Sequence, residues 1–415
     1  MSPRAVPLVG GEETSSPPAA VRPAGLPERR AGVSLPPRSL YIHIPFCERR
    51  CEYCDFVSMG GRDREREYMD ALGIEIRGLA QRLGRVELDT VFVGGGTPSY
   101  VDPARLARLL GEVRELFALS PGAEVSLEAN PSSVTRARAR AWRAAGFTRV
   151  SLGIQSLEPD ILAFLGRVHD ARRAMEAVSE VRAAGFERVS CDLIYAVPGL
   201  DDARWRSVLE RVVALGPGHV SAYELTVEPG TPLHARVRRG LARPVGAEVA
   251  LRQHRIAAEV LGAAGLRRYE VSNHARPGEE SRHNLVYWRR GHYLAAGLGA
   301  HGHIPVELAE ALGLPRFAEA VSVRYWHGRS LPAYLAAPPG LLPIEGAEPV
   351  GAREAETERL MLGLRLAEGV ELDAAPGTRA AQLARAGLLW HRGGRVGATA
   401  RGQRVLNEVI RLLAA

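Results

Sequence analysis

A repeated pattern of helix, glycine and strand organises the chain between residues 40 and 225. Residues 144–152 read AAGFTRVSL, residues 183–191 read AAGFERVSC, and a shorter echo, AAGLRRY, occupies residues 263–269. In each copy the glycine follows a helical stretch and fits the C′ position, where a left-handed residue ends a helix and leads into the next strand. The pattern therefore predicts repeated β/α units of similar length.

Six strands alternate with five helices in this part of the chain. The expected strands are residues 40–44, 90–93, 124–128, 149–154, 188–195 and 219–225, and the expected helices are residues 64–83, the segment opened by Asp102 and Pro103, and residues 134–145, 171–184 and 202–215. Asp102 has the character of an N-cap and Pro103 that of a first helical residue. This alternation predicts an α/β fold with parallel strands and helical crossovers. Six units favour a partial (β/α)6-type barrel, and a doubly wound sheet is the alternative.

Outside the repeats, we divide the chain by composition. Residues 1–38 contain eight prolines and no aromatic residue, which predicts a disordered tail, and they lack the apolar run of a signal peptide or membrane helix. We assign residues 39–240 to the barrel, the less regular residues 241–340 to an extension of the barrel, and residues 341–415 to a C-terminal domain. The prolines at positions 338, 339 and 343 mark the last boundary.

The C-terminal segment has the pattern of a winged helix. Helices are expected over residues 354–366, 379–386 and 403–413, with a hairpin over 388–398 whose tip is a pair of glycines. Residues 353–415 hold ten arginines against seven acidic residues. Nucleic-acid binding and a role as a packing lid are both compatible with that balance, and the lid is the simpler reading. All 54 basic residues of the chain are arginine, which excludes a Schiff-base lysine or a P-loop lysine.

Three of the four cysteines, Cys47, Cys51 and Cys54, fall within eight positions directly after the first strand. A long chain with so few cysteines is no secreted disulfide scaffold, so the cluster points to metal or redox chemistry. A structural zinc site normally takes four ligands, but the fourth thiol, Cys191, lies inside a predicted buried strand. Three thiolates suit a [4Fe–4S] cluster that leaves one iron free.

The segment from Tyr41 to Cys47, YIHIPFC, followed by the CxxxCxxC spacing, resembles the radical SAM superfamily. The resemblance covers about residues 39–415 and is strongest to the group that contains oxygen-independent coproporphyrinogen III dehydrogenase and the heme chaperones. It implies that the three cysteines hold the cluster and that the free iron binds S-adenosylmethionine. The reduced cluster then cleaves S-adenosylmethionine to methionine and a 5′-deoxyadenosyl radical.

Polar residues and glycines follow successive predicted strands, which is where parallel sheets bind ligands. A tight turn or a helix cap is the alternative explanation at each position. The resemblance implies that S-adenosylmethionine contacts Tyr41, Gly95, Gly96, Thr97, Glu128, Gln155, Arg167, Asp192 and Thr226. His43 lies between Tyr41 and Cys47 in the sequence. It either tunes the cluster or makes a structural bond within its strand.

Two features separate the branches of the group. The dehydrogenases carry a further cysteine two residues after the third ligand, where this chain has Phe56, and an ordered N-terminal arm in place of the proline-rich tail. Residues 282–288, RHNLVYW, and residues 297–302, GLGAHG, resemble the heme chaperone branch. His283 is the candidate heme ligand, because an imidazole can ligate heme iron. Residues 241–340, which contain it, are then the expected porphyrin-binding region. Alternatively, His283 pins a loop over the barrel mouth.

We therefore expect a cytoplasmic heme chaperone with a [4Fe–4S] cluster, S-adenosylmethionine and heme. Its expected partners are heme-accepting proteins, among them membrane proteins, and a flavodoxin- or ferredoxin-type electron donor; we expect neither nucleic-acid binding nor membrane embedding. The alternative is an oxygen-independent coproporphyrinogen III dehydrogenase, which performs oxidative decarboxylation through the 5′-deoxyadenosyl radical.

Overall fold

The computed structural model describes residues 37–338, 340–375 and 377–414. Most of the predicted disordered tail, residues 1–36, lies outside this range. Arg38, the last residue assigned to the tail, is part of the folded structure, because its guanidinium Nε lies 2.6 Å from a carboxylate oxygen of Asp89. The described chain therefore joins the first strand slightly earlier than predicted.

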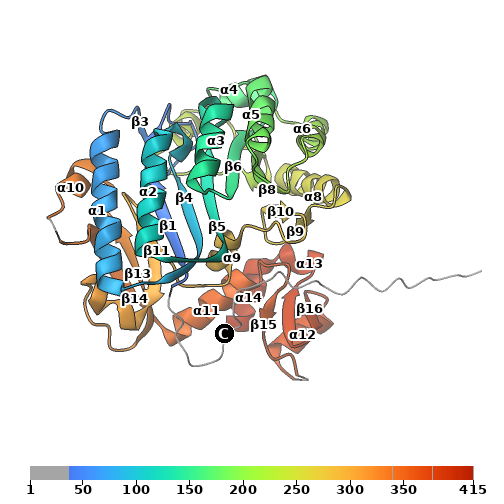
Figure 1. Cartoon of the computed structure of the whole chain (residues 1–415). Helices are drawn as coiled ribbons and strands as arrows, with labels where there is room; N and C mark the ends of the chain where they lie inside the picture. Colours follow the sequence, from blue (N-terminus) through green and yellow to red (C-terminus); the bar gives the residue numbers. More distant parts are fainter. Residues whose placement is uncertain (1–36, 339, 376, 415) are drawn as a thin grey trace, which may run out of the picture.

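One large sheet carries the predicted β/α units (Figure 1). Its nine strands run in the order β11 (Leu294–Ala296), β1 (Ser39–Ile44), β4 (Glu87–Gly95), β5 (Ala118–Ala129), β6 (Arg149–Gln155), β7 (Arg188–Tyr195), β8 (His219–Glu224), β10 (Asn273–Ala275) and β9 (Arg267–Arg268). The pairs from β11 to β8 are parallel, and β10 pairs antiparallel with β8 and β9.

The strand order decides between the two predicted architectures. From β1 through β4 to β8, each new strand adds beside the one before it, whereas a doubly wound sheet reverses its order at a switch point. The doubly wound alternative is therefore wrong, and the singly wound arrangement of a partial barrel is confirmed. Within the described residues, the end strands β11 and β9 do not pair with each other.

The crossover helices pack along one face of this sheet (Figure 1). They are α1 (Glu65–Leu83), α2 (Pro103–Leu116), α3 (Arg136–Ala145), α5 (Ala171–Ala183) and α6 (Asp202–Ala214), followed by α8 (Ala247–Ala263). Asp102 accepts a hydrogen bond from the Ala104 amide and Pro103 occupies the first turn of α2, as predicted. Gly146, with a φ of 100°, caps α3 in the left-handed conformation that the repeat predicted. The 17-residue helix α8 lies in the segment expected to be irregular.

A second, antiparallel sheet follows, made of β12 (His301–Pro305), β13 (Ala320–His327) and β14 (Ile344–Gly351). The short helix α9 (Arg282–Trp288) precedes it. Because β14 pairs with β13 along most of its length, this sheet continues across the boundary predicted at residue 340.

The C-terminal segment has its own small core, built around Leu360, Leu383, Val396 and Val409. Its elements are α11 (Ala352–Gly363), β15 (Val370–Glu371), α12 (Arg379–Arg385), β16 (Leu389–Arg392), β17 (Arg395–Ala398), α13 (Ala400–Gln403) and α14 (Leu406–Ala414). The predicted hairpin is confirmed as β16 and β17, and β15 adds a third strand to it. The final predicted helix is divided into α13 and α14.

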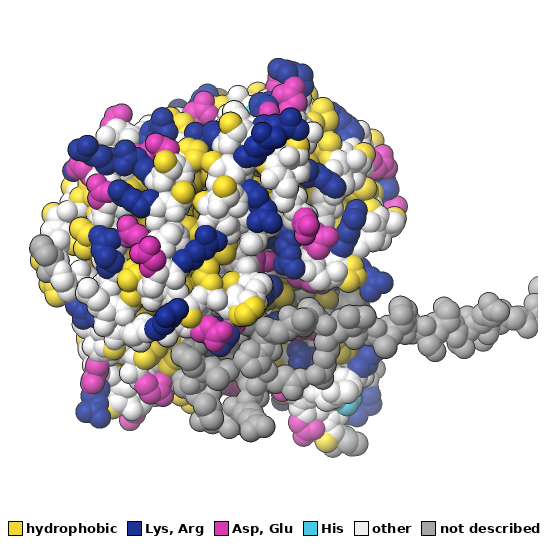
Figure 2. Space-filling view, in the orientation of Figure 1, with side chains coloured by type: hydrophobic (Ala, Val, Ile, Leu, Met, Phe, Trp, Pro, Cys, Tyr) yellow, Lys and Arg dark blue, Asp and Glu magenta, His cyan; other side chains and the backbone are white. Residues whose placement is uncertain are grey.

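Arginine and carboxylate side chains alternate over the face of the molecule that bears α1 and α2 (Figure 2). Arg77 lies 2.6 Å from Glu112, and Arg108 contacts Asp70. The net positive charge is thus partly paired on this face and forms no single basic stripe there. In the described part of the chain, no helix is long and apolar enough to cross a membrane.

Candidate functional site

The cysteine loop leaves β1 at the carboxyl edge of the sheet. Cys47 ends the two-residue strand β2 (Phe46–Cys47), which pairs with β3 (Met59–Gly60), so the intervening loop is closed at its base. The Glu52 amide donates to the Leu165 carbonyl oxygen at 3.2 Å, and the Glu52 carbonyl oxygen accepts from the Leu233 amide at 2.8 Å. These bonds fix the loop that carries Cys51 and Cys54 against two distant segments.

Each cysteine has a donor close by. The Thr97 hydroxyl lies 3.4 Å from Cys47 Sγ, Arg167 Nη1 donates to Cys51 Sγ at 3.1 Å, and Arg50 bonds the Cys54 carbonyl oxygen. Burial raises the pKa of the Cys54 thiol to about 11 and also raises the pKa of Cys47.

In the described residues, no three His, Cys, Asp or Glu side chains converge on a point that would hold a single metal ion. A cube of four irons needs ligands spread around it, and three thiols on one pinned loop provide that kind of donor set.

The turn after β4 passes so close to the cysteine loop that only glycine fits. A Cβ added to Gly96 would lie 2.7 Å from the carbonyl group of Pro45 and 3.0 Å from Cys47 Sγ. Gly95 has a φ of 114°, and a Cβ there would meet the His43 ring at 2.6 Å. The backbone of this turn is therefore open to a ligand on its free side, beside the cysteines.

Two carboxylates lie on the strands either side of β6, Glu128 near the end of β5 and Asp192 within β7. Glu128 Oε2 accepts from the Gly95 amide at 3.0 Å, and Asp192 accepts from the hydroxyls of Ser151 and Ser221. Burial, reinforced by the charge of Asp192, raises the pKa of Glu128 to about 8. Burial also raises the pKa of Asp192, against the effect of its two serine donors. A cationic or hydroxyl-bearing ligand would offset the energetic cost of burying both carboxylates in their charged form.

Gln155 and Arg167 adjoin the same edge. Gln155 adopts a left-handed φ of 65°, unusual for a residue with a side chain, at the end of β6. Its Oε1 and the Nε of Arg167 are buried and have no hydrogen-bond partner among the described residues. Arg167 Nη2 donates to the Gly153 carbonyl oxygen at 2.8 Å, which holds the guanidinium at the cysteine loop. The two unpaired polar atoms fit a polar ligand at this position.

Thr226 is the last of the nine predicted ligands. It is exposed, two residues beyond the end of β8, and no hydrogen bond in the described part of the chain connects it with the other predicted ligands. Its contact with S-adenosylmethionine stays a prediction, and Tyr41, another of the nine, lies at the wall of a cavity.

That cavity, of about 360 Å³, opens beside the glycine turn. Tyr41, Gly95 and Glu128 line it together with Tyr287 and Tyr293. The remaining lining residues are His43, Asp55, Phe56, Val57, Gly299, His301 and Arg329. Phe56, the residue that replaces a cysteine of the dehydrogenases, is 59% exposed at this cavity. The lining thus combines polar and charged groups with four aromatic side chains of Tyr and Phe.

His43 and His283 are both engaged in structural bonds. His43 Nε2 donates to the Val57 carbonyl oxygen at 2.7 Å, and its Nδ1 then accepts from the Tyr41 hydroxyl at 3.0 Å. His283 is 1% exposed, with Nδ1 at 2.7 Å from the Thr90 hydroxyl and Nε2 at 2.8 Å from the Tyr287 hydroxyl. Burial lowers the pKa of His283 to about 3. In this conformation, His283 has no free nitrogen for heme iron and instead holds Tyr287 at the cavity.

Several residues of the site escaped the sequence reasoning. Ser151 and Ser221 are donors to Asp192, and Tyr293 lines the cavity beside Tyr287 of the RHNLVYW motif. The repeated RVS triplet contained a signal for Ser151. Side chains of alternate strand residues lie on the same face of a sheet, so Ser151 and Asp192 of the neighbouring strand share a face. Nothing in the sequence indicated that Tyr293 lines the same cavity as Tyr41.

Comparison with known proteins identifies the class of protein first. Residues 41–212 match the model of the Radical SAM superfamily, which confirms the predicted class and implies a [4Fe–4S] cluster and S-adenosylmethionine as cofactors. Among solved structures, the chain resembles coproporphyrinogen III oxidase (HemN) from Escherichia coli with a TM-score of 0.74. That alignment covers 92% of this chain and 90% of the other at 21% identity, so it shows a shared fold.

The relatives then identify the branch. The heme chaperone HemW of Mycobacterium tuberculosis is 42% identical over 403 residues, which cover 93% of this chain and 99% of the relative. The heme chaperone HemW of Synechocystis is 36% identical over 82% of this chain and 80% of the relative. The chain belongs to the family of these heme chaperone HemW proteins, as the sequence predicted.

Proposed function

We propose that this protein binds heme and passes it to acceptor proteins, and that a [4Fe–4S] cluster and S-adenosylmethionine occupy the neighbouring site. The observation that carries the proposal is the cavity shared by the two halves of the site. Its lining contains Gly95 of the glycine turn and Glu128, together with aromatic side chains that include the exposed Phe56. A flat apolar macrocycle suits an aromatic wall, since π faces stack favourably.

The chain's own residues have distinct tasks in this proposal. Cys47, Cys51 and Cys54 hold the cluster, and Arg167 donates to the Cys51 sulfur, which offsets its negative charge. When bound, the cluster and S-adenosylmethionine supply an electron and a source of the 5′-deoxyadenosyl radical.

The open backbone around Gly95 and Gly96 admits the polar end of S-adenosylmethionine. Glu128 and Asp192 accept hydrogen bonds from its amino or ribose hydroxyl groups, and Gln155 offers its unpaired oxygen.

The family supports a chaperone rather than a decarboxylase. The relatives that cover most of the chain are named heme chaperones, while the likeness to coproporphyrinogen III oxidase is one of fold. Phe56 at the cavity agrees with this assignment, because a bulky apolar side chain occupies the place of a thiol. We further propose a cytoplasmic location and an electron donor of the flavodoxin or ferredoxin type.

The test is a heme-transfer experiment on the full chain after anaerobic reconstitution of its cluster. We expect saturable binding of heme. When an apo-heme protein is then added, the absorption spectrum of its heme-bound form should appear. A coproporphyrinogen decarboxylation assay runs in parallel with S-adenosylmethionine and a reductant. Rapid decarboxylation, or an absence of heme binding, would refute the proposal.

A further inference from the structure

His301 presents an imidazole at the cavity with no hydrogen bond to either ring nitrogen among the described residues. It is the first residue of β12 and is exposed, in contrast to the buried His283. Of the two histidines that border the cavity, His43 has both nitrogens bonded. His301 is therefore the one imidazole of the described lining that can take a metal ligand's role without first breaking a bond.

The backbone around His301 is held firmly. The Gly299 amide donates to the Gly328 carbonyl oxygen at 2.9 Å, and the His327 amide donates to the Ala300 carbonyl oxygen at 2.9 Å. The His301 ring lies nearly parallel to the Trp326 ring, at 26° and 6.3 Å between centroids. Burial and nearby positive groups lower the pKa of His301, which favours the neutral imidazole that binds iron.

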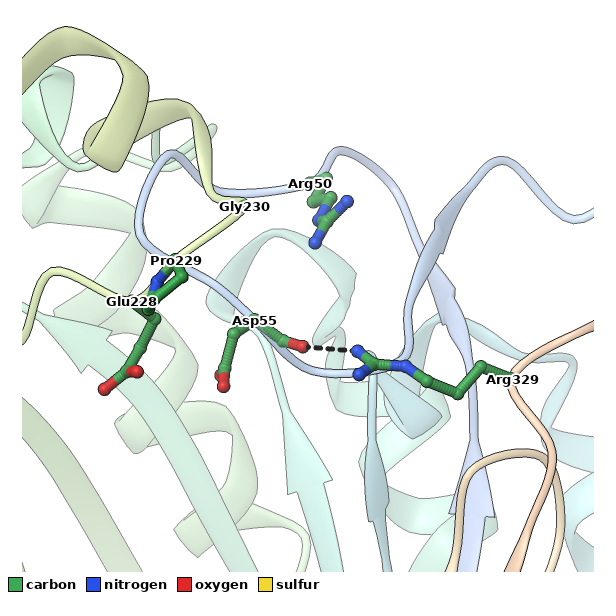
Figure 3. A pocket seen from close by; sticks show the side chains of 6 residues that line it. All are labelled: Arg50, Asp55, Glu228, Pro229, Gly230 and Arg329. Atoms are coloured by element: carbon green, nitrogen blue, oxygen red, sulfur yellow. Dashed lines mark hydrogen bonds between the residues drawn. The ribbon is translucent and has the colours of Figure 1, made fainter. Parts of the chain in front are cut away.

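A second cavity, of about 370 Å³, adjoins the first, because Asp55 and Arg329 line both. Figure 3 shows Arg50 and Arg329 converging on it from two loops, with Arg329 Nη2 bonded to the Asp55 carbonyl oxygen at 3.1 Å. The carboxylates of Asp55 and Glu228 point away from these guanidinium groups (Figure 3). Two arginines beside an aromatic chamber suit a ligand that carries carboxylates at one edge of an apolar plate.

We propose that His301 would ligate the heme iron, with the macrocycle in the cavity lined by Tyr287 and Tyr293 and with Arg329 and Arg50 holding its propionates. This inference rests on the proposed function and names the residue that performs it. In it, His283 is a positioning residue, because its Nε2 holds the Tyr287 hydroxyl at the cavity wall.

The experiment is a titration of the anaerobically reconstituted full chain with ferric heme, followed by absorption and electron paramagnetic resonance. We expect His301→Ala to weaken heme binding at least about tenfold, as loss of a ligand should exceed loss of its outer-shell partners. Added imidazole should restore the wild-type spectrum in His301→Ala, a response that a merely structural role would not produce. His391→Ala, which removes an exposed histidine from the C-terminal hairpin, is the matched control.

The outcomes separate the two claims. If the wild-type chain binds no heme, both the proposed function and this inference fail. If the wild type binds heme and His301→Ala keeps its affinity and spectrum, this inference alone fails. Because the His301 side chain is exposed and makes no hydrogen bond in the described structure, an unchanged thermal midpoint should confirm that His301→Ala is folded.

Discussion

Gly96 is the position where a single methyl group should most directly damage the site. Its amide donates to the Ile44 carbonyl oxygen at 2.8 Å, and the next amide, of Thr97, donates to Phe46 at 2.8 Å. These two bonds join the end of β4 to the strand that delivers Cys47. In Gly96→Ala, the new Cβ would stand 2.7 Å from the Pro45 backbone, where ordinary contacts begin at 3.4 Å.

The size of the effect follows from that geometry. Backbone cannot rotate away as a side chain can, so the two strand ends must separate by roughly 0.7 Å to reach ordinary contact. Overpacking of this kind costs about 1–3 kcal/mol, and weakening two hydrogen bonds costs about 1 kcal/mol each. We therefore expect Gly96→Ala to lower the free energy of unfolding by about 3–5 kcal/mol and to displace Cys47.

The assay is urea unfolding of the wild type and Gly96→Ala, with iron content measured after anaerobic reconstitution. Gly111→Ala is the matched control, since Gly111 lies within α2 and a Cβ there meets nothing within 4 Å. That control should stabilise the protein by about 0.5–1 kcal/mol through helix propensity. If Gly96→Ala unfolds at the wild-type midpoint and keeps its iron, the close approach of the turn to the cysteine loop is refuted.

Three further predictions concern the thiols, the buried carboxylate and the buried histidine. Cys51→Ala should abolish iron incorporation, whereas Cys191→Ala should keep it and lose only about 1 kcal/mol of stability, measured by iron analysis and urea unfolding. The pKa of Glu128 is about 8, and S-adenosylmethionine should bind the ionised carboxylate. Affinity for S-adenosylmethionine should therefore fall about tenfold for each pH unit below 8. Calorimetry should show that Glu128→Gln removes this pH dependence. The pKa of His283 is about 3 in the fold, below its unfolded value of about 6.5. The free energy of unfolding should therefore fall as the pH drops below 6.5, by up to about 1.4 kcal/mol per pH unit. Equal urea midpoints at pH 7 and pH 5, after correction with His283→Gln, would contradict this.

The β/α core was predictable because its signals are local. Alternating apolar residues, an N-cap at Asp102 and a helix-ending glycine at Gly146 each act within a few residues, and the structure confirms them. The edges of the sheet were not predictable in this way. β11 pairs with β1 through residues about 250 positions apart, such as Leu40 and Leu294, and a three-residue strand carries no periodicity of its own.

The polar side of the site was likewise encoded at strand ends. Glu128 and Asp192 follow directly from the rule that parallel strands present their carboxyl ends to a ligand, because each strand brings its own residue to a common edge. Thr226 followed the same rule but lies beyond the end of β8, which stops at Glu224. Strand boundaries are weakly encoded to within one or two residues, so the place of Thr226 relative to the end of its strand was not predictable.

The aromatic side needed the tertiary structure, and the two histidines of the heme chaperone motifs show why. His283 lies in the more distinctive motif, yet its ring is buried against Thr90, 193 residues away, and the sequence contains no sign of that contact. His301 lies in a short glycine-rich turn, whose glycines let the backbone pass within reach of Val57 and leave the imidazole facing the cavity. A motif therefore marks where the chain is constrained, while burial decides which of its side chains meets a ligand. On this argument, the exposed histidine of the less distinctive motif is the better candidate for heme iron.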